Sequence, residues 1–411
     1  MNVIRILHTS DWHLGSQICG KKRYVEHENF LSWLLSLIED EKPDILIVAG
    51  DIFDSGTPPN RSLELYYQFL GRIARSCCRH VIITAGNHDS PSLISAPREL
   101  CSHLNITVIG TIPHDPKEIV MTLYNRDDLP GCIVCPVPYL RDRDIRTARA
   151  GESAGEKTAC LLDGIRSCYN EIGRCAESLR EQFGDIPIIA TGHLFAAGGT
   201  TREDDGSRDL YLGTLACVGE DVFPSCIDYL ALGHLHLPQK VSGKDTRRYS
   251  GAPLPMGFGE AGAKKAVLLI DINPGSLISI REVPVPVFQP LVRFKGTFDE
   301  IISEINRLMW EGSSVYAEIL LEDNFVIPDA QEKISDITAG TPVEVLRVKN
   351  TRAIGVLSGP DSYESLDQIS PEEVFKRRMD LAKISDDERE ELLEMFREVR
   401  TDLYEEDKNA G

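Results

Sequence analysis

The sequence predicts an α/β fold over residues 1–286, on two observations. Short apolar runs rich in Val and Ile alternate with longer stretches in which apolar residues recur at helical spacing. Each of the first runs is followed closely by Gly or His, as expected where a strand ends in a functional loop. These runs are Val3–Leu7, Ile45–Ala49, Val81–Ala85 and Ile186–Thr191.

The intervening stretches predict helices. In the first of them, Tyr24–Glu39, the apolar residues form one stripe along a helix. Strands alternating with helices indicate an α/β architecture. Further helices are expected at Ser62–Arg75 and Lys157–Phe183, and later strands at Tyr229–Leu232, Arg247–Ser250, Ala266–Asp271 and Leu277–Pro284.

Two regions follow. Val283–Pro290 predicts an extended connector, because each proline disfavours helix in the residue before it. A small α+β domain is predicted over residues 287–350, with strands at Leu291–Lys295, Val315–Leu321 and Val343–Val348 and helices at Phe298–Met309 and Asp329–Thr338. Residues 351–411 are predicted to hold a linker and C-terminal helices, one beginning at Ser370 and one at Ser385–Leu403.

The composition is that of a soluble enzyme. The 411 residues contain no run of eighteen apolar residues, and the N-terminus lacks the features of a secretion signal. We therefore expect no membrane association and a cytoplasmic protein. The eleven cysteines are expected to be reduced, and Cys132–Cys135, a lone C-x-x-C with apolar filling, is interpreted as part of a strand rather than a zinc site.

The formal net charge of −20 argues against a broad grip on nucleic acid by the chain alone, because phosphate contacts need Lys and Arg. It does not exclude a DNA substrate. Metal ions bound by carboxylates reverse the local charge, and a basic partner could supply phosphate contacts.

Five short polar segments each follow an apolar run, so each is expected where a strand delivers side chains to a loop. Each segment alone is a weak signal, because a D-x-H pair is often a surface pair and G-N-H-D can be a tight turn. Their number and order favour a shared site. They hold five of the ten histidines and are Asp11-Trp-His13, Gly50-Asp51, Gly86-Asn-His-Asp89, Gly192-His193 and Gly233-His-Leu-His236.

The side chains of these segments suit two divalent metal ions. They supply carboxylate, amide and imidazole groups and no thiol, a set that suits Mn²⁺, with Fe or Zn as alternatives. In D-x-H and H-x-H, an extended strand would place both side chains on one face. Asp51 is the expected bridge between the ions. The expected ligands are Asp11, His13, Asp51, Asn87, His193, His234 and His236.

Two ions about 4 Å apart can activate water and stabilise the attacking and leaving oxygens of a phosphoryl displacement. The reaction also needs a proton for the leaving alkoxide or a cation near the phosphorus. We assign this catalytic role to His88, beside Asn87, with Asp89 as the carboxylate that orients it.

The ordered set of segments resembles the calcineurin-like metallophosphoesterase superfamily, which includes phosphatases, cyclic-nucleotide phosphodiesterases, nucleotidases and DNA nucleases. By position, the seven expected ligands match its metal ligands and His88 its catalytic histidine. Asp54 stands where archaeal and eukaryotic recombination nucleases have a second histidine. Longer stretches are similar to the bacterial SbcD family of nuclease subunits, namely His8–Gly15, Ala49–Pro59, Cys135–Arg141, Arg208–Thr214 and Tyr249–Pro255.

The resemblance implies a four-layer α/β/β/α sandwich, a homodimer, and a complex with SbcC, an ABC-type ATPase with a long coiled coil. It implies Mn²⁺-dependent exonuclease action on duplex DNA ends and endonuclease action on hairpins or single strands, in DNA repair, recombination and replication. It also implies a capping role for residues 287–350. The alternatives are a small-molecule phosphomonoesterase or cyclic-nucleotide phosphodiesterase on the same site, and a scaffold without activity, which the complete ligand set disfavours.

Two hypotheses come from the residues themselves. Lys21, Lys22 and Arg23 form the basic cluster nearest the expected metals, and we expect them to contact the DNA backbone from a loop; the alternative is a solvated helix start. Apolar residues are interspersed with charges from Pro371 to Leu403, and we expect this segment to dock on the SbcC coiled coil rather than on its own chain.

Overall fold

The computed structural model describes residues 3–146, 154–196, 218–273, 276–323, 327, 329–350 and the single positions 379, 389, 392 and 393. It divides into two compact units. The larger is Met1–Arg293 with Leu308–Glu318 and Gly340–Arg347, and the smaller is Phe294–Arg307, Ile319–Ala339 and Val348–Gly411. The domain boundaries predicted at 286 and 350 stay predictions. The stretch Arg208–Thr214 lies outside the described residues, as does almost all of the predicted C-terminal helical segment.

The first of two six-stranded sheets in the larger unit has the order β14-β13-β1-β4-β5-β6. Strands β1, β4, β5 and β6 are parallel, and β13 is antiparallel to its neighbours β1 and β14. The strands are β1 (Ile4–Thr9), β4 (Ile45–Ala49), β5 (His80–Thr84), β6 (Ile106–Ile109), β13 (Ala266–Asn273) and β14 (Ser276–Pro284).

The second sheet has the order β11-β12-β10-β9-β8-β7. Its four central strands are parallel, and the two edge strands are antiparallel to their neighbours. The strands are β7 (Met121–Tyr124), β8 (Pro130–Cys135), β9 (Ile188–His193), β10 (Tyr229–Gly233), β11 (Gln239–Val241) and β12 (Lys244–Tyr249).

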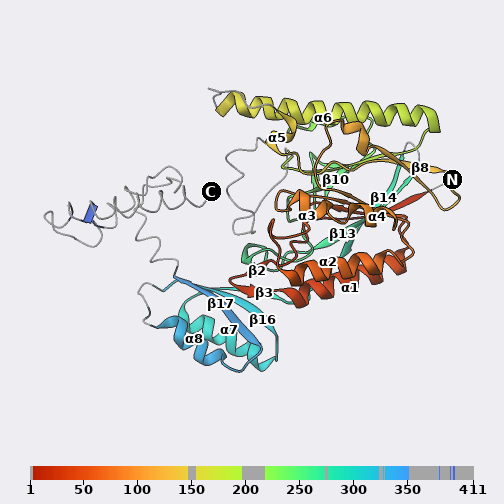
Figure 1. Cartoon of the computed structure of the whole chain (residues 1–411). Helices are drawn as coiled ribbons and strands as arrows, with labels where there is room; N and C mark the ends of the chain where they lie inside the picture. Colours follow the sequence, from red (N-terminus) through yellow and green to blue (C-terminus); the bar gives the residue numbers. More distant parts are fainter. Residues whose placement is uncertain are drawn as a thin grey trace. The chain divides into compact units, whose positions relative to one another are not determined.

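Helices cover the outer faces of both sheets (Figure 1). Helices α1 (Tyr24–Glu41) and α2 (Asn60–Ile73) pack on the first sheet, and α6 (Ala154–Phe183) packs on the second. The layers are therefore helix, sheet, sheet, helix, which confirms the predicted four-layer sandwich. Shorter helices in the connections are α3 (Pro91–Ser95), α4 (Arg98–Ser102), α5 (Asp142–Ile145), η1 (Pro116–Ile119), η3 (Glu220–Val222) and η4 (Phe258–Glu260).

The apolar runs of the sequence are explained by burial on both faces of each strand. In the first sheet, Leu46 and Val48 of β4 pack with the cluster under α1 and α2, whereas Ile45 and Ile47 pack between the sheets. Because successive side chains point to opposite faces, a strand between two apolar layers needs apolar residues at every position.

The predicted helices and strands of residues 1–286 are found with ends shifted by a few residues. Cys132 and Cys135 lie buried in β8 with free thiols, so their interpretation as strand residues is confirmed. One expectation is wrong: Lys21 and Lys22 are not in a loop but form β3 (Lys21–Lys22), which pairs with β2 (Gln17–Ile18) in a small hairpin.

The last described elements form the α+β region that the sequence predicts after the connector. A three-stranded sheet has the order β15-β16-β17, and the elements are β15 (Leu291–Gly296), α7 (Phe298–Trp310), β16 (Val315–Leu321), α8 (Ala330–Thr338) and β17 (Val343–Asn350). Among the described residues, no helix is long and apolar enough to cross a membrane.

Candidate metal centre

The predicted ligands all lie at or just after the carboxyl ends of parallel strands. Segments after β1, β4 and β5 of the first sheet meet the end of β9 and the segment after β10 of the second sheet. Parallel strands deliver their carboxyl ends to one edge, where the connecting loops can carry function. The structure thus brings together residues that are more than two hundred positions apart in the chain.

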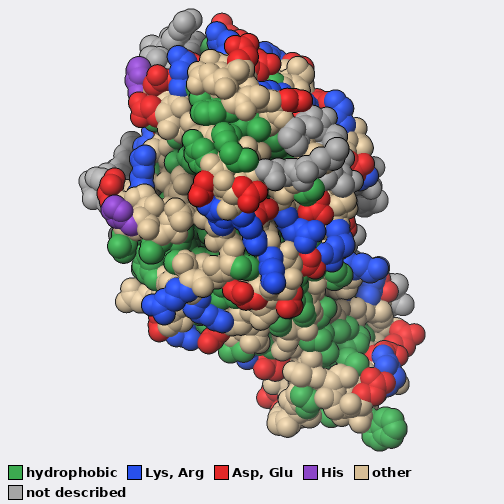
Figure 2. Space-filling view, turned by 90° about the vertical axis from the view of Figure 1, so that its right-hand side faces the viewer, with side chains coloured by type: hydrophobic (Ala, Val, Ile, Leu, Met, Phe, Trp, Pro, Cys, Tyr) green, Lys and Arg blue, Asp and Glu red, His purple; other side chains and the backbone are tan. Residues whose placement is uncertain are grey.

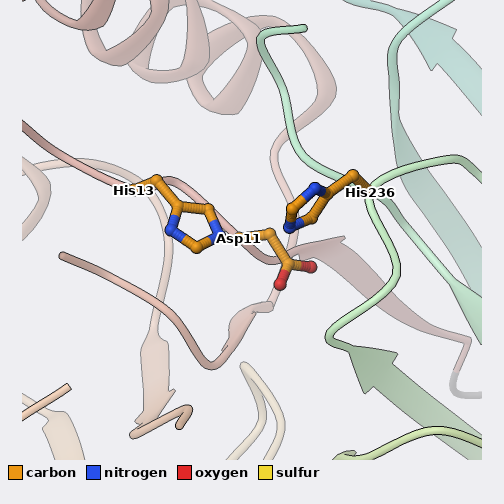
Figure 3. A group of neighbouring side chains, drawn as sticks. All are labelled: Asp11, His13 and His236. Atoms are coloured by element: carbon orange, nitrogen blue, oxygen red, sulfur yellow. The ribbon is translucent and has the colours of Figure 1, made fainter. Parts of the chain in front are cut away.

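One group of candidate ligands consists of Asp11, His13 and His236. One oxygen or nitrogen atom from each lies within 4.8 Å of those of the other two, and all three residues are buried. Figure 3 shows the two imidazole rings on either side of the Asp11 carboxylate. The rings of His13 and His236 are 5.1 Å apart between centroids and nearly perpendicular.

A second group consists of Asp51, Asn87, His193 and His234. Nε2 of His193 lies 3.1 Å from Oδ2 of Asp51 and 3.0 Å from Oδ1 of Asn87. The same Asn87 oxygen lies 3.1 Å from Nδ1 of His234. One carboxylate, one amide oxygen and two imidazoles therefore converge on one point.

Asp51 joins the two groups. Its Oδ2 lies 3.7 Å from Nε2 of His13, and its carboxylate also falls within 4.8 Å of ligand atoms of Asp11 and His193. A carboxylate between two ligand sets has the geometry of a bridging ligand, which is the role expected for Asp51.

The residues fit divalent metal ions. Both ring nitrogens of His13 are buried without a hydrogen-bond partner, although buried polar groups are nearly always paired. Leaving such atoms unpaired is costly unless a ligand satisfies them. The donor set of carboxylate, amide and imidazole groups without a thiol suits Mn²⁺, Fe or Zn.

The backbone is strained at this centre. Asp11, His13, Asp51 and His234 have φ angles of 53°, 44°, 50° and 103°, values that residues other than glycine rarely adopt. The expectation that strand alternation places Asp11 and His13 on one face is therefore wrong, because β1 ends at Thr9. Hydrogen bonds from the N–H groups of Asp11 and His13 to backbone oxygens of residues 50 and 51 hold the turn instead.

Glycines before the ligands allow the backbone to approach closely. A Cβ at Gly86 would overlap the carboxylate and N–H of Asp51, and a Cβ at Gly233 would overlap the carbonyl of Ala49. Gly50 has a φ of +87° and packs against the ring of His193. At these positions only glycine allows the two backbones to approach so closely.

The charges of the centre act strongly on one another. Burial would raise the pKa of Asp51, but the histidines around it, His193 first, hold that pKa well below its usual range. Burial would lower the pKa of His193, yet the Asp51 carboxylate raises it to about 9. Burial and the neighbouring His193 lower the pKa of His234 to about 3. The centre thus favours an ionised Asp51 and a neutral His234.

His88 lies at the side of this centre. Its backbone N–H donates a 2.8 Å hydrogen bond to Oδ1 of Asp51, and its ring stands 4.9 Å from that of His13. Nδ1 of His88 lies 2.8 Å from the carbonyl oxygen of Asp54. Since a carbonyl only accepts, Nδ1 carries a proton, and Nε2 is left to exchange one.

Asp89 does not orient His88, contrary to expectation. Its carboxylate accepts hydrogen bonds from the N–H groups of Ile52, Phe53 and Gly86 at 3.1, 2.9 and 2.8 Å. These bonds tie the loop after β4 to the loop after β5. Burial, and then the Asp51 charge, raise the pKa of Asp89 to about 6. The carbonyl of Asp54 contacts the His88 ring in the place expected for Asp89.

Comparison with known proteins agrees with this geometry. Residues 4–238 match the family model of the calcineurin-like phosphoesterases, and residues 287–383 match one described as the type 5 capsule protein repressor C-terminal domain. The SbcD subunit of the nuclease SbcCD from Escherichia coli K12 is 39% identical over 96% of this chain and 97% of its own length.

The chain belongs to the SbcD family of calcineurin-like phosphoesterases. The Bacillus subtilis protein of the same name is 30% identical over 98% of this chain and all of its own length. The protein of that name from Rhodobacter capsulatus is 35% identical over 74% of this chain and 76% of its own length.

In this SbcD family member, Tyr139 and Arg141 brace the His88 loop, a role that the sequence pattern did not predict. The N–H of Tyr139 donates to the carbonyl of Ala85 at 2.8 Å, and Nη2 of Arg141 donates to the carbonyl of Asp89 at 2.9 Å. The two residues therefore hold both ends of the loop that carries Asn87 and His88. The stretch Cys135–Arg141 resembles the family and could have drawn attention to these two residues. The resemblance of the whole stretch, however, assigns no role to a single residue.

The basic cluster at Lys21–Arg23 does not form one exposed surface. Arg23 is 2% exposed and its guanidinium bonds both oxygens of Glu26 and the carbonyl of Pro255. Nζ of Lys21 lies 2.5 Å from Glu344. The expected DNA contact by Arg23 is therefore wrong for this conformation, whereas Lys22 is exposed.

Proposed function

We propose that this chain is the nuclease subunit of an SbcC–SbcD-type complex and hydrolyses DNA phosphodiester bonds with two divalent metal ions. The observation that carries the proposal is the Asp51 carboxylate, which joins two complete ligand groups beside an imidazole free at Nε2. The relatives, each named as the SbcD subunit of the nuclease SbcCD, support DNA as the substrate.

In this proposal Asp11, His13 and His236 hold one ion, Asn87, His193 and His234 hold the other, and Asp51 contacts both. When bound, the ions supply positive charge that stabilises the phosphoryl transition state and makes a water nucleophilic at neutral pH. We propose Mn²⁺ because the ligands mix oxygen and nitrogen donors.

His88 is proposed as the group that moves a proton. Its Nδ1 is fixed by the Asp54 carbonyl, so the ring cannot turn freely, and Nε2 is the atom left for the reacting oxygens. In the cationic form Nε2 donates a proton to the leaving alkoxide, and the ring returns to the neutral form. The backbone N–H of His88 meanwhile keeps the ring beside Asp51.

The proposed partners are DNA, an SbcC-type ABC ATPase and a second copy of the chain. We propose that the chain acts in the cytoplasm. Its proposed activities are exonuclease action on duplex ends and endonuclease action on hairpins or single strands. Residues 287–350 are proposed to restrict which DNA reaches the metals, and Pro371–Leu403 to bind the ATPase. A chain ending at Asn350 should then lose the ATPase but keep Mn²⁺-dependent cleavage; a complex that survives this truncation would contradict the proposed docking.

The net charge of −20 repels DNA phosphates, so DNA binding requires a local surface with basic side chains. Figure 2 shows Lys and Arg side chains gathered in a band on one face, with acidic side chains among them. We retain Lys21 and Lys22 as the proposed DNA contacts after the exclusion of Arg23. Changing both to Ala should weaken DNA binding and reduce its salt dependence; unchanged affinity and slope would remove them from the DNA path.

The deciding test compares substrates for the Mn²⁺-loaded chain, alone and with its ATPase partner. A labelled DNA hairpin is compared with a cyclic nucleotide and a nucleoside monophosphate. Cleavage of the hairpin at a far higher kcat/KM supports the nuclease proposal. Hydrolysis of a nucleotide with an uncut hairpin under both conditions would keep the metal site and overturn DNA as the substrate.

A further inference from the structure

A buried ion pair lies outside the ligand set, between η4 and the start of β13. Nζ of Lys265 lies 2.7 Å from Oε2 of Glu260, and the two side chains are 5% and 0% exposed. Burying two charges carries a large desolvation penalty, and an ion pair in the interior often adds no net stability over apolar residues. The pair therefore calls for an explanation other than stability.

The ammonium of Lys265 also reaches the metal centre through the backbone. Nζ donates a 2.8 Å hydrogen bond to the carbonyl oxygen of His236, which accepts a second bond from the N–H of Ala252 at 3.1 Å. His236 follows the end of β10 in a segment where His234 has a strained φ of 103°. The backbone carbonyl of His236, a candidate ligand, is thus held by the buried ammonium of Lys265.

Glu260 fixes the direction of that cation. Its Oε2 accepts from Lys265 and from the N–H of Met256 at 2.7 Å, while its Oε1 is buried without a hydrogen-bond partner. With one oxygen anchored to the backbone, the carboxylate holds the ammonium at a set place. The contact chain runs from the Met256 backbone through Glu260 and Lys265 to the His236 backbone.

We propose that Lys265 is a positioning residue for His236, held in place by Glu260, and that the pair sets the affinity of the ion bound by Asp11, His13 and His236. This inference rests on the proposed two-metal function. Residues that orient a metal ligand commonly change metal affinity about 10- to 100-fold when replaced. Lys265 would act through the backbone of its ligand rather than through the imidazole.

The test measures Mn²⁺ binding to the full-length chain by electron paramagnetic resonance of the free ion, with thermal unfolding alongside. Lys265→Met removes the donor to His236. Because it leaves Glu260 buried and unpaired, the double variant Lys265→Met/Glu260→Gln removes that charge as well. Lys264→Met is the matched control, since the neighbouring lysine is exposed.

We expect Lys265→Met and the double variant to bind one of the two ions about 10- to 100-fold more weakly. The double variant should recover thermal stability without recovering affinity, and Lys264→Met should match the native chain. In a His236→Ala background, Lys265→Met should cause no further loss at the remaining site, because both changes affect one ligand.

Two results would overturn the proposal. The first is a folded double variant that binds both ions as tightly as the native chain. The second is an equal loss at both sites that persists in the His236→Ala background, which would give Lys265 a general structural role. A native chain that binds no Mn²⁺ would instead defeat the two-metal function, and the role of Lys265 with it.

Discussion

The backbone N–H of His88 donates a 2.8 Å hydrogen bond to Oδ1 of Asp51. Oδ2 of the same carboxylate lies 3.1 Å from Nε2 of His193 and 3.7 Å from Nε2 of His13. One carboxylate thus connects the backbone of the proposed proton donor to both ligand groups. Because the His88 ring takes no part in this hydrogen bond, we expect mutation to separate proton transfer from metal binding.

His88→Ala should abolish most DNA cleavage while both ions stay bound. The substitution removes the ring but keeps the N–H that bonds Asp51. Loss of a general acid or base lowers the rate about 10²- to 10⁴-fold. Hairpin cleavage and metal content are measured together, with the exposed His103→Ala as control. Loss of metal in parallel with activity would assign His88 to metal binding.

Asp51→Asn should weaken both metal sites, whereas His236→Ala should remove only one. Asp51 contacts both groups, and His236 belongs to one of them. A ligand at 100 times its Kd stabilises the folded state by about 2.7 kcal/mol. The rise in Tm with Mn²⁺ over a chelator should therefore be nearly lost in Asp51→Asn and reduced in His236→Ala. Equal effects of the two variants would contradict the bridging role.

Gly86→Ala should disrupt the centre from the backbone side. The added Cβ would overlap the Asp51 carboxylate, and overpacking of this kind costs about 1–3 kcal/mol. Gly71→Ala is the matched control, since nothing lies within 4 Å of its added Cβ and α2 should gain about 0.5–1 kcal/mol. Urea unfolding and Mn²⁺ titration measure both effects. Normal metal binding by Gly86→Ala would show that the loop can yield.

Acid should destabilise the fold through His8. Burial lowers the pKa of His8 to about 3, well below the unfolded value near 6.5. The unfolded state therefore takes up the proton first, and the stability contributed by neutral His8 is complete above about pH 6.5 and lost as pH falls toward 3, by up to about 1.4 kcal/mol per pH unit.

His8→Asn should accordingly reduce the loss of unfolding free energy between pH 7 and pH 5, measured by urea unfolding. In the native chain, Nδ1 of His8 lies 3.0 Å from the hydroxyl of Tyr229. The substitution loses this hydrogen bond and therefore some stability at every pH, so the slope of the unfolding free energy against pH is the informative quantity. His103→Asn, at an exposed position, should keep the native slope. An unchanged slope in His8→Asn would place the acid sensitivity elsewhere.

Arg141→Met should slow cleavage without touching a ligand side chain. Its guanidinium bonds the Asp89 carbonyl at the end of the loop that carries Asn87 and His88. Small displacements of a catalytic group can cost about 10²-fold in rate. We expect a fall of about 10- to 100-fold in hairpin cleavage, and none in Arg143→Met, whose side chain is 77% exposed. Native activity in Arg141→Met would contradict the proposed role of Arg141 in holding the His88 loop.

Strand β4 was predictable because it is apolar and buried along its whole length. Val48 of β4 packs under the helices and Ile47 packs between the two sheets, so both faces of the strand require apolar side chains. Some short strands escaped prediction: β7 (Met121–Tyr124) has one buried residue, Leu123, and carries little pattern. The β2–β3 hairpin likewise has only two residues in each strand.

The sequence by itself determined the candidate ligands that the structure brings together, because ligand chemistry resides in residue type and each candidate lies at or just after the end of a predicted strand. Only the tertiary structure decided how these residues are held. Asp89 bonds the backbone of Ile52 and Phe53, Arg23 turns inward to Pro255, and Lys265 reaches the carbonyl of His236. Such contacts depend on left-handed turns and on loops from two sheets that meet at one edge. Neither feature produces a repeating pattern of apolar residues in the sequence, so neither can be predicted from periodicity.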